Sequence, residues 1–315
     1  MKCSVVGLGS MGLGMAKSLL WAGLQTTGYD LDPAALKAFE ELGGRAAMSP
    51  GEAAEGAAVL VIAVVNAQQT ESVLFETGGG ALSLSAGSVV LSCATMAPAE
   101  ARGLAARLEA LGILFLDAPV SGGPVKAADG ALTIMASGSP AAFERARPCL
   151  EAMGETIYEL GETPGAGSAM KVVNQLLAGV HIAAASEALT FGKRMGLDVD
   201  TVYEVITGAA GNSWMFENRM PHVLAGDYAP KSAVDIFVKD LGIVSDIARS
   251  ERFPVPVASA ALQMFLMTSA AGMGKDDDSS VARLYAQIAG LDLPQPAPTP
   301  DLSDDDATVR RDNVA

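Results

Sequence analysis

Three glycines near the start of the chain are the first residues with a defined chemical use. Gly7, Gly9 and Gly12 stand as G-L-G-S-M-G between a short apolar run and a helical pattern. In such a strand–turn–helix the first glycine permits a tight turn, the second admits a pyrophosphate to the backbone, and the third allows close helix–strand packing. The N–H groups that begin the helix, those of Ser10 and Met11, would face the phosphates. The loop therefore predicts a dinucleotide site.

An acidic residue follows at the position suited to the ribose of a dinucleotide. Asp30 ends the second predicted strand, 23 residues after Gly7. A carboxylate there would bind the adenosine ribose hydroxyls and repel a 2′-phosphate, and no Arg follows it immediately. The sequence thus predicts NAD rather than NADP. Asp32 is predicted only as a helix cap, because Pro33 suits the first position of a helix.

A lysine and two amides form a second group with chemical potential. Lys171, Asn174 and Gln175 are spaced i, i+3 and i+4, which places them on one face of a helix. They lie in a long stretch over 165–196 that is rich in Ala, Leu and Val. About 28 helical residues would span about 40 Å, and an apolar helix of that length is usually buried between two bodies. Its polar start either faces a cleft or is simply hydrated.

Another glycine-rich segment, DAPVSGG (117–123), ends with Ser121, Gly122 and Gly123. A hydroxyl beside two flexible residues exposes backbone N–H groups that could cradle a carboxylate. By composition alone, an ordinary exit from a strand is the competing explanation.

The elements that must position these residues are of two kinds. At least through residue 120, strands alternate with helices of about 10–15 residues, which indicates βαβ units and a mostly parallel sheet. After Pro164 only helical patterns follow. We expect an α/β Rossmann domain over 1–164, an all-α domain over 165–292 joined through the long interdomain helix, and a disordered Pro-rich acidic tail over 293–315. The predicted strands are 3–6, 26–30, 45–48, 58–65, 88–95, 113–120, 131–138 and 156–161, and the helices of the second domain are 167–195, 198–209, 213–225, 231–251, 255–271 and 278–290.

Composition narrows the classes of partner. The net charge of −15 argues against nucleic acid and against an anionic membrane. Two His and three scattered Cys make a metal site or disulfides unexpected. The start, MKCSVVGLG, contains no apolar targeting segment, and no apolar run reaches the about 20 residues of a membrane span. We therefore expect a cytoplasmic protein, and the long helix favours a homodimer or homotetramer.

Four motifs together resemble the β-hydroxyacid dehydrogenase family. GLGSMG, DAPVSGG, GAGSAMKVVNQ and FVKDLGI occur in the order and approximate spacing of that family, over residues 1 to about 292. The resemblance implies a Rossmann domain joined by a long helix to a helical domain, and oxidation of small hydroxy acids with NAD(P).

The resemblance also implies roles for the matched residues. Lys171 would be the catalytic acid/base, and Ser121, Gly122 and Gly123 would hold the substrate carboxylate. Asn174 would bind a substrate oxygen.

Three further matched positions complete the implied site. Thr95, at the end of SVVLSCAT, would lie beside the cofactor, and Lys239 would lie by the nicotinamide and close the site. Gln175 stands where several relatives carry a second Asn, so either Asn174 or Gln175 could contact the substrate.

In such a mechanism a base must take the hydroxyl proton, and a lysine with a pKa of ~10.4 is a poor base. Burial and a place in the first turn of a helix are both expected to lower the pKa of Lys171. His181 lies about 15 Å further along the helix, and we expect it to be an interior histidine with its polar atoms satisfied.

Two segments bear on the substrate. Within the family, the L-threonate dehydrogenase branch is the one most resembled by TGAAGNSWMFENRMPHVLAGDY (207–228) and GKDDDSSVARLY (274–285). The tartronate-semialdehyde reductases and the 3-hydroxyisobutyrate dehydrogenases are the competing branches. Candidates for reading the far end of the substrate are Asn212, Trp214, Phe237 and Asp278. Core packing competes as the role of Trp214 and Phe237, and a solvated helix start as that of Asp278.

Two alternatives of other classes stay open. One is an NADPH-dependent semialdehyde reductase, which would have to tolerate the 2′-phosphate. The other is a cofactor-binding scaffold without turnover, against which the joint presence of Lys171, Asn174 and Ser121 argues.

Overall fold

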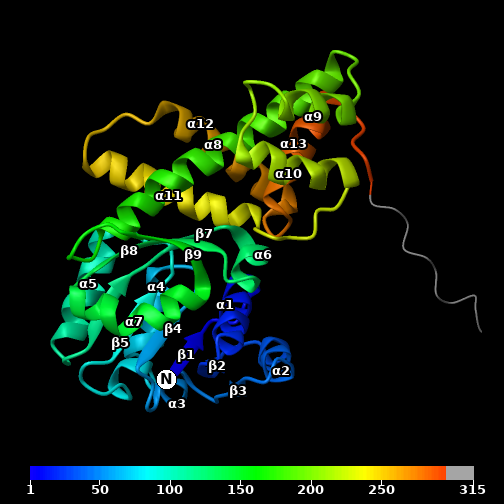
Figure 1. Cartoon of the computed structure of the whole chain (residues 1–315). Coiled ribbons are helices and arrows are strands. Elements are labelled where there is room, and N and C mark those ends of the chain that lie inside the picture. Colours follow the sequence, from blue (N-terminus) through cyan, green and yellow to red (C-terminus); the bar gives the residue numbers. More distant parts are fainter. Residues whose placement is uncertain (296–315) are drawn as a thin grey trace, which may run out of the picture.

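A mostly parallel sheet forms the first half of the protein, whose computed structural model describes residues 1–295 (Figure 1). Within those residues nine strands pair in the order β3-β2-β1-β4-β5-β6-β8-β7, with β9 beside β8. Strands β1 to β6 are parallel to one another, β8 is antiparallel to β6 and β7, and β9 is parallel to β8. The strands are β1 Lys2–Val6, β2 Gln25–Tyr29, β3 Arg45–Ala46, β4 Val59–Ile62, β5 Val89–Ser92, β6 Leu114–Asp117, β7 Val120–Ser121, β8 Leu132–Gly138 and β9 Gly154–Glu159.

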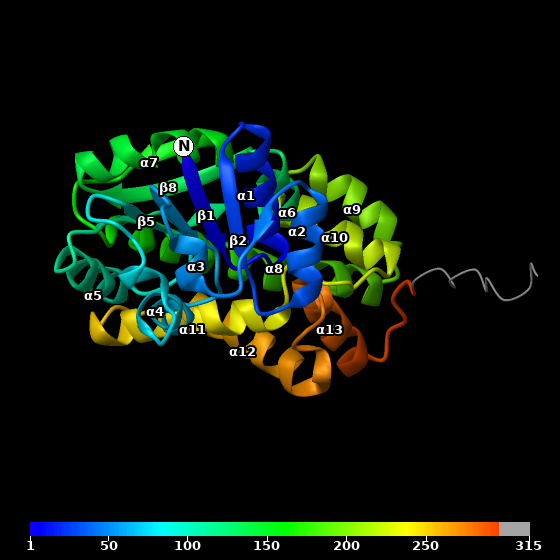
Figure 2. The same ribbon diagram turned by 90° about the horizontal axis from the view of Figure 1, so that it is seen from below.

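Both faces of the central strands are buried, which explains why their sequences are continuously apolar. Along β4, Val59 and Val61 enter one core cluster, whereas Leu60 and Ile62 enter the other. This alternation follows the period of two of a β-strand. Figure 2 shows helices on both faces of the sheet. One face is covered by α1 Ser10–Trp21, α2 Pro33–Glu41, α6 Gly123–Ala128 and α7 Pro140–Met153, and the other by α3 Pro50–Ala54, α4 Ala67–Phe75 and α5 Pro98–Glu109.

Two local differences from the sequence-based expectation have simple causes. The predicted strand 113–120 is divided into β6 and β7, because the chain leaves β5 after Asp117 and Pro119 cannot donate to a ladder. Helix α4 was not expected, since AQQTESVLF carries few apolar residues. Its start is nevertheless marked by Asn66, whose side chain accepts a hydrogen bond from the Gln69 N–H.

Every element after β9 is helical within the described residues, which confirms the expected fold class. Helix α8 packs against α9 to α13, and its buried face enters two core clusters. These helices are α8 Ala166–Arg194, α9 Val199–Thr207, α10 Trp214–Ala225, α11 Val234–Ser250, α12 Pro256–Thr268 and α13 Val281–Ala289, with short π and 3₁₀ turns at Ser269–Met273 and Asp278–Ser280. Leu293, the first residue of the predicted tail, is buried in the second cluster. The rest of that tail from 296 on lies outside the described residues.

The 29-residue helix α8 is long and apolar enough, by length and a mean hydropathy of 1.3, to cross a membrane. The sequence had indicated no such segment, because short polar interruptions hide the run. The same composition is also typical of a helix in the core of a protein. Five further helices pack on α8, which agrees with a core helix.

Candidate active site

The glycine loop adopts the conformation that its sequence predicted. Gly7 has a φ of +92°, in the region that favours glycine. A Cβ at Gly12 would lie 1.8 Å from the carbonyl oxygen of Gly7, so no side chain fits there. A Cβ at Gly9 would meet no atom of the chain within 4 Å. The space beside Gly9 is therefore open to a ligand, which is the space that a dinucleotide pyrophosphate requires.

Two cavities meet at this loop, at the carboxyl ends of the parallel strands. The central cavity, about 490 Å³, lies between the loop and the helical domain. The Asp30 cavity, about 590 Å³, lies on the other side of Gly9 and is also lined by Gly7 and Asp30. All the other predicted site residues line the central cavity: Gly9, Ser10, Met11, Gly12, Thr95, Ser121, Gly122, Gly123, Lys171, Asn174, Gln175 and Lys239. The structure thus brings together the residues that the sequence singled out.

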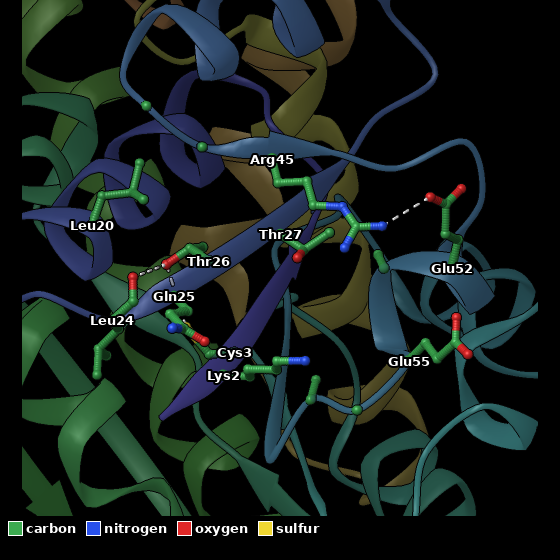
Figure 3. A pocket seen from close by; sticks show the side chains of 15 residues that line it. Lys2, Cys3, Leu20, Leu24, Gln25, Thr26, Thr27, Arg45, Glu52 and Glu55 are labelled. Carbon is green, nitrogen blue, oxygen red and sulfur yellow. Dashed lines mark hydrogen bonds and ion pairs between the residues drawn. The ribbon is translucent and has the colours of Figure 1, made fainter.

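A third cavity of about 630 Å³ lies at the amino ends of β1 and β2, on the opposite edge of the sheet. Figure 3 shows Lys2, Arg45, Glu52 and Glu55 around it, with Arg45 reaching toward Glu52 at 3.5 Å. Ligands of open α/β sheets bind at the carboxyl ends of the strands. We therefore place the active site at the central cavity, although the third cavity is larger.

The Asp30 carboxylate is held in place at the end of β2 by two backbone N–H groups. It accepts hydrogen bonds from the N–H groups of Leu8, at 2.5 Å, and Asp32, at 2.9 Å. Asp30 borders the cavity on one side of the glycine loop. Asp32 caps α2, as expected, by accepting a hydrogen bond from the Ala34 N–H.

The start of α8 is fixed to the sheet by Asp117, the last residue of β6. Its carboxylate accepts hydrogen bonds from the N–H groups of Gly165 and Ser168, at 2.9 and 2.8 Å, and from the Ser168 hydroxyl at 2.7 Å. The Ser137 hydroxyl on β8 accepts from the Gly167 N–H at 3.0 Å. Burial raises the pKa of Asp117, and the bonds from Ser168 and Gly165 oppose that rise. Nothing in the sequence indicated this role of Asp117 beyond the position of an acid at a strand end.

Lys171 is buried, and burial lowers its pKa to about 8. The nearby Asp240 charge opposes this shift and the Lys239 charge adds to it. The helix dipole does not lower the pKa of Lys171 as the sequence predicted. Lys171 is the sixth residue of α8 and so lies in its second turn, and the carboxylate of Asp117 already occupies free N–H groups of the first turn. Desolvation therefore supplies the shift.

A chain of polar contacts runs from Asn174 across the cleft. The Asn174 amide donates to Gln175 Oε1 at 2.9 Å, and the Gln175 amide donates to Asp240 Oδ2 at 2.5 Å. Lys239 Nζ lies 2.7 Å from Asp240 Oδ1 and donates to the Val65 carbonyl at 2.8 Å. Val65 follows β4, so this last bond joins the helical domain to the sheet domain across the cleft. Both ends of the Gln175 amide are engaged, whereas the Asn174 carbonyl has no hydrogen-bond partner among residues 1–295, and Asn174 lines the central cavity.

The four candidates for the far end of the substrate lie in different places. Trp214 lines the central cavity and is half exposed. Phe237 also borders it, but its ring is buried and stacks on Phe265 at 5.1 Å between ring centroids. Asn212 is not among the lining residues, and its amide donates to Thr207 and Glu217. Asp278 is fully buried and does not line the central cavity.

Asp278 is therefore not a solvated helix start. It accepts from Arg219 Nε at 2.6 Å, and it is Arg219 that reaches the central cavity. His181, expected in the interior, is only partly buried and does not line the cavity. The sequence-based reasoning missed Arg219, Lys231 and Asp240, of which only Asp240, next to Lys239, could have been noticed from a motif.

A dinucleotide loop, an acid for the ribose, and a buried lysine in an interdomain cleft define a nicotinamide-dependent dehydrogenase. Comparison with known proteins agrees. Residues 2–161 match the family described as the NAD binding domain of 6-phosphogluconate dehydrogenase, and residues 165–285 match the one described as NAD-binding of NADP-dependent 3-hydroxyisobutyrate dehydrogenase. The chain is similar to L-threonate dehydrogenase of Cupriavidus necator, with 52% identity over 92% of this chain and 97% of the relative.

Two further relatives extend the match. L-threonate dehydrogenase of Escherichia coli (strain K12) is 51% identical over 92% of this chain and 95% of its own. A crystal structure named 3-hydroxyisobutyrate dehydrogenase, from Salmonella typhimurium, superposes with a TM-score of 0.87 at 54% identity, over 90% of this chain and 99% of that one. The chain belongs to the β-hydroxyacid dehydrogenase family, as its motifs predicted. It is an NAD-dependent oxidoreductase that acts on CH–OH groups.

Proposed function

We propose that this dehydrogenase oxidises L-threonate to 2-dehydro-L-erythronate (2-oxo-tetronate) with NAD. The observation that carries the proposal is about 50% identity, along nearly the whole chain, to proteins named L-threonate dehydrogenase. The central cavity supports it chemically, because a basic lysine, an amide and a glycine-rich loop border one space suited to a small hydroxy acid. The assignment of roles to individual residues is part of the proposal.

In the proposed reaction Lys171 moves the proton. When bound, NAD accepts a hydride from the carbon that carries the reacting hydroxyl. Neutral Lys171 takes the hydroxyl proton on Nζ as the carbonyl forms, and the ammonium returns it in the reverse direction. Its pKa of about 8 places both protonation states within reach near neutral pH. Closure of the two domains around the cavity excludes water and strengthens these interactions.

The remaining predicted residues bind and orient the ligands. Ser121, Gly122 and Gly123 hold the substrate carboxylate with their hydroxyl and N–H groups, and the free carbonyl of Asn174 makes it the amide that contacts a substrate hydroxyl. Gln175 orients Asn174 and connects it to Asp240.

The cofactor would extend along the glycine loop. Gly7, Gly9, Ser10, Met11 and Gly12 would hold the pyrophosphate, as their positions on the two cavities allow. Asp30 would bind the adenosine ribose. Thr95 and Lys239 would lie beside the nicotinamide.

The experiment that tests the function is a substrate screen with NAD, followed by NADH absorbance. L-threonate, D-threonate, L-tartrate, D-glycerate and 3-hydroxyisobutyrate are compared at equal concentration. We expect the highest kcat/KM with L-threonate. The second candidate is oxidation of 3-hydroxyisobutyrate, which the name of the Salmonella structure favours. A preference for 3-hydroxyisobutyrate contradicts the proposal. A preference for D-glycerate, which a tartronate-semialdehyde reductase would show, also contradicts it.

We further propose a cytoplasmic homodimer or homotetramer that serves the catabolism of sugar acids. Met170, Val173 and Leu177 are spaced on one face of α8 and are exposed in the isolated chain. A second copy that covers this face would bury them. Light scattering after gel filtration measures the mass of the assembly, and a monomer at micromolar concentration contradicts the oligomer.

A further inference from the structure

Two cations border the central cavity from the helical domain, and no motif in the sequence drew attention to them. Arg219 lies on α10, and Lys231 lies on the loop between α10 and α11. The glycine-rich loop and Lys171 contribute to the same cavity from β7 and α8. The two cations therefore belong to a part of the wall that the predicted carboxylate site does not use.

The charge of Arg219 is already compensated. Its Nε donates to Asp278 Oδ1 at 2.6 Å, and its guanidinium also donates to Asn218. Asp278 is fully buried, and burial raises its pKa to about 6. A guanidinium paired in this way with a buried carboxylate contributes structure to the wall, because removing either partner leaves the other unpaired.

Lys231 has a different partner. Its Nζ lies 2.9 Å from His222 Nε2, and His222 Nδ1 lies 2.9 Å from Asp277 Oδ1. An ammonium can only donate, so Nε2 must accept and Nδ1–H donates to Asp277. In this contact the positive charge of Lys231 therefore has no carboxylate as its direct partner. The remaining N–H groups of Lys231 are available to a ligand in the cavity.

The loop that carries Lys231 is fixed by the acidic segment beneath it. Asp277 Oδ2 accepts from the Lys231 N–H at 3.2 Å, the Asp277 N–H donates to Tyr228, and the Asp278 N–H donates to Ser232. Burial opposes ionisation of Asp277, but hydrogen bonds from His222 and Ser279 outweigh it and lower its pKa to about 2. The carboxylate is thus a stable acceptor. These contacts hold Lys231 at the wall before a ligand arrives, which lowers the entropic cost of binding.

We propose that Lys231 determines specificity by donating a hydrogen bond to the terminal hydroxyl of the substrate, at the end opposite the carboxylate. This inference rests on the proposed function, and it defines the substrate class as short hydroxy acids that end in a hydroxyl. With the carboxylate on the loop at Ser121 and the reacting carbon at Lys171, the far end of a four-carbon acid is the part left for Lys231. An acid that ends in a methyl group leaves the ammonium without its acceptor, and such a site discriminates against the analogue.

The test compares L-threonate with its 4-deoxy analogue, the 2,3-dihydroxybutanoate of matching configuration, in wild type and in Lys231→Met. Methionine keeps most of the length of the side chain and removes the charge and the donors. We expect Lys231→Met to lose about tenfold or more in kcat/KM for L-threonate, the value of a hydrogen bond to a charged group, and to lose at most about threefold for the analogue. Lys231→Gln, which keeps a neutral donor, should recover part of the discrimination. Lys275→Met, an exposed lysine that does not line the cavity, is the matched control.

The outcomes separate this inference from the function on which it rests. Wild type alone tests the function: without turnover of L-threonate that proposal fails. The inference fails if the acid that is oxidised carries no terminal hydroxyl besides the reacting one, or if Lys231→Met does not change the discrimination between that acid and its terminal-deoxy analogue. An unchanged ratio of kcat/KM between the two substrates in Lys231→Met overturns the inference. Equal losses for both substrates, in particular, show a merely structural role for Lys231.

Discussion

The pH dependence of turnover in the two directions tests the chemistry of Lys171 most directly. Burial lowers the pKa of this lysine from 10.5 to about 8. At pH 7 about one molecule in eleven then carries the neutral base, against about one in three thousand at the ordinary value, a gain of about 300-fold. Varying the pH changes the fraction of neutral Lys171, and Lys171→Met removes the proton carrier while keeping most of the bulk of the side chain.

The two directions should respond oppositely. Oxidation of the alcohol needs neutral Lys171, so kcat/KM should rise about tenfold per pH unit up to pH 8 and then level off. Reduction of the oxo acid needs the ammonium, so kcat/KM should be constant below pH 8 and fall above it. NADH absorbance follows both reactions. Lys171→Met should lose about 10²–10⁴-fold in both directions, while NAD binding by fluorescence changes little.

The same shift makes a prediction about stability. The pKa of Lys171 is lower in the folded chain than in the unfolded one, so below pH 8 both states bind the proton and the folded state holds a buried charge. The free-energy cost of burying the Lys171 ammonium disappears as the pH rises from about 8 to 10.5, because the folded state loses this proton first. Lys171→Met should therefore unfold with a free energy up to about 3 kcal/mol higher than wild type at pH 7, and the gain should shrink toward pH 10. Near-native turnover of Lys171→Met, or an oxidation rate that keeps rising until about pH 10, contradicts the assignment of Lys171 as the base.

Three further predictions concern the cofactor loop and the start of α8. Asp30→Ala should lower the ratio of kcat/KM with NAD to kcat/KM with NADP by about tenfold or more. Asp32→Ala removes only a helix cap, so it should leave that ratio unchanged and lower the free energy of unfolding by about 1 kcal/mol. Gly9→Ala should keep the melting temperature but weaken NAD binding by calorimetry, because its Cβ meets only open space, while Gly12→Ala should fail to fold natively. Asp117→Asn should cost about 2–4 kcal/mol in denaturant unfolding, since an amide cannot accept on both atoms, and a loss below 1 kcal/mol would contradict the role of this carboxylate.

Local patterns were enough to predict the outline of the fold. The run at Val59–Ile62 is apolar at every position because both faces of the sheet are covered, and that pattern is visible in sequence. Lys171 and Asn174 could be placed on one face because the period of a helix is fixed. The glycine loop was readable because its residues are consecutive and each has a steric reason.

The parts that could not be predicted depend on contacts between distant segments. Asp117 reaches Gly165 across 48 residues of chain, and His222 reaches Asp277 across 55. Nothing in either segment alone distinguishes an anchoring carboxylate from a solvated one. For the same reason the sequence offered Asp278 either as a contact of the substrate or as a solvated helix start, whereas in the folded chain it is buried and its partner Arg219 lines the central cavity.

The fixed start of α8 has a consequence for how substrate enters and product leaves. Because Asp117 and Ser137 hold the first turn of α8 to β6 and β8, the helical domain cannot lift away at that point without losing several buried bonds at once. On the far side of the cleft, Lys239 spans to Val65 through one hydrogen bond, a contact worth only about 1–2 kcal/mol. The two domains are therefore held together firmly at the start of α8 and only weakly at Lys239. Breaking the Lys239 contact costs far less free energy than breaking the buried bonds at the start of α8, so we expect any opening of the cleft to begin at Lys239 while Lys171 keeps its alignment to the sheet.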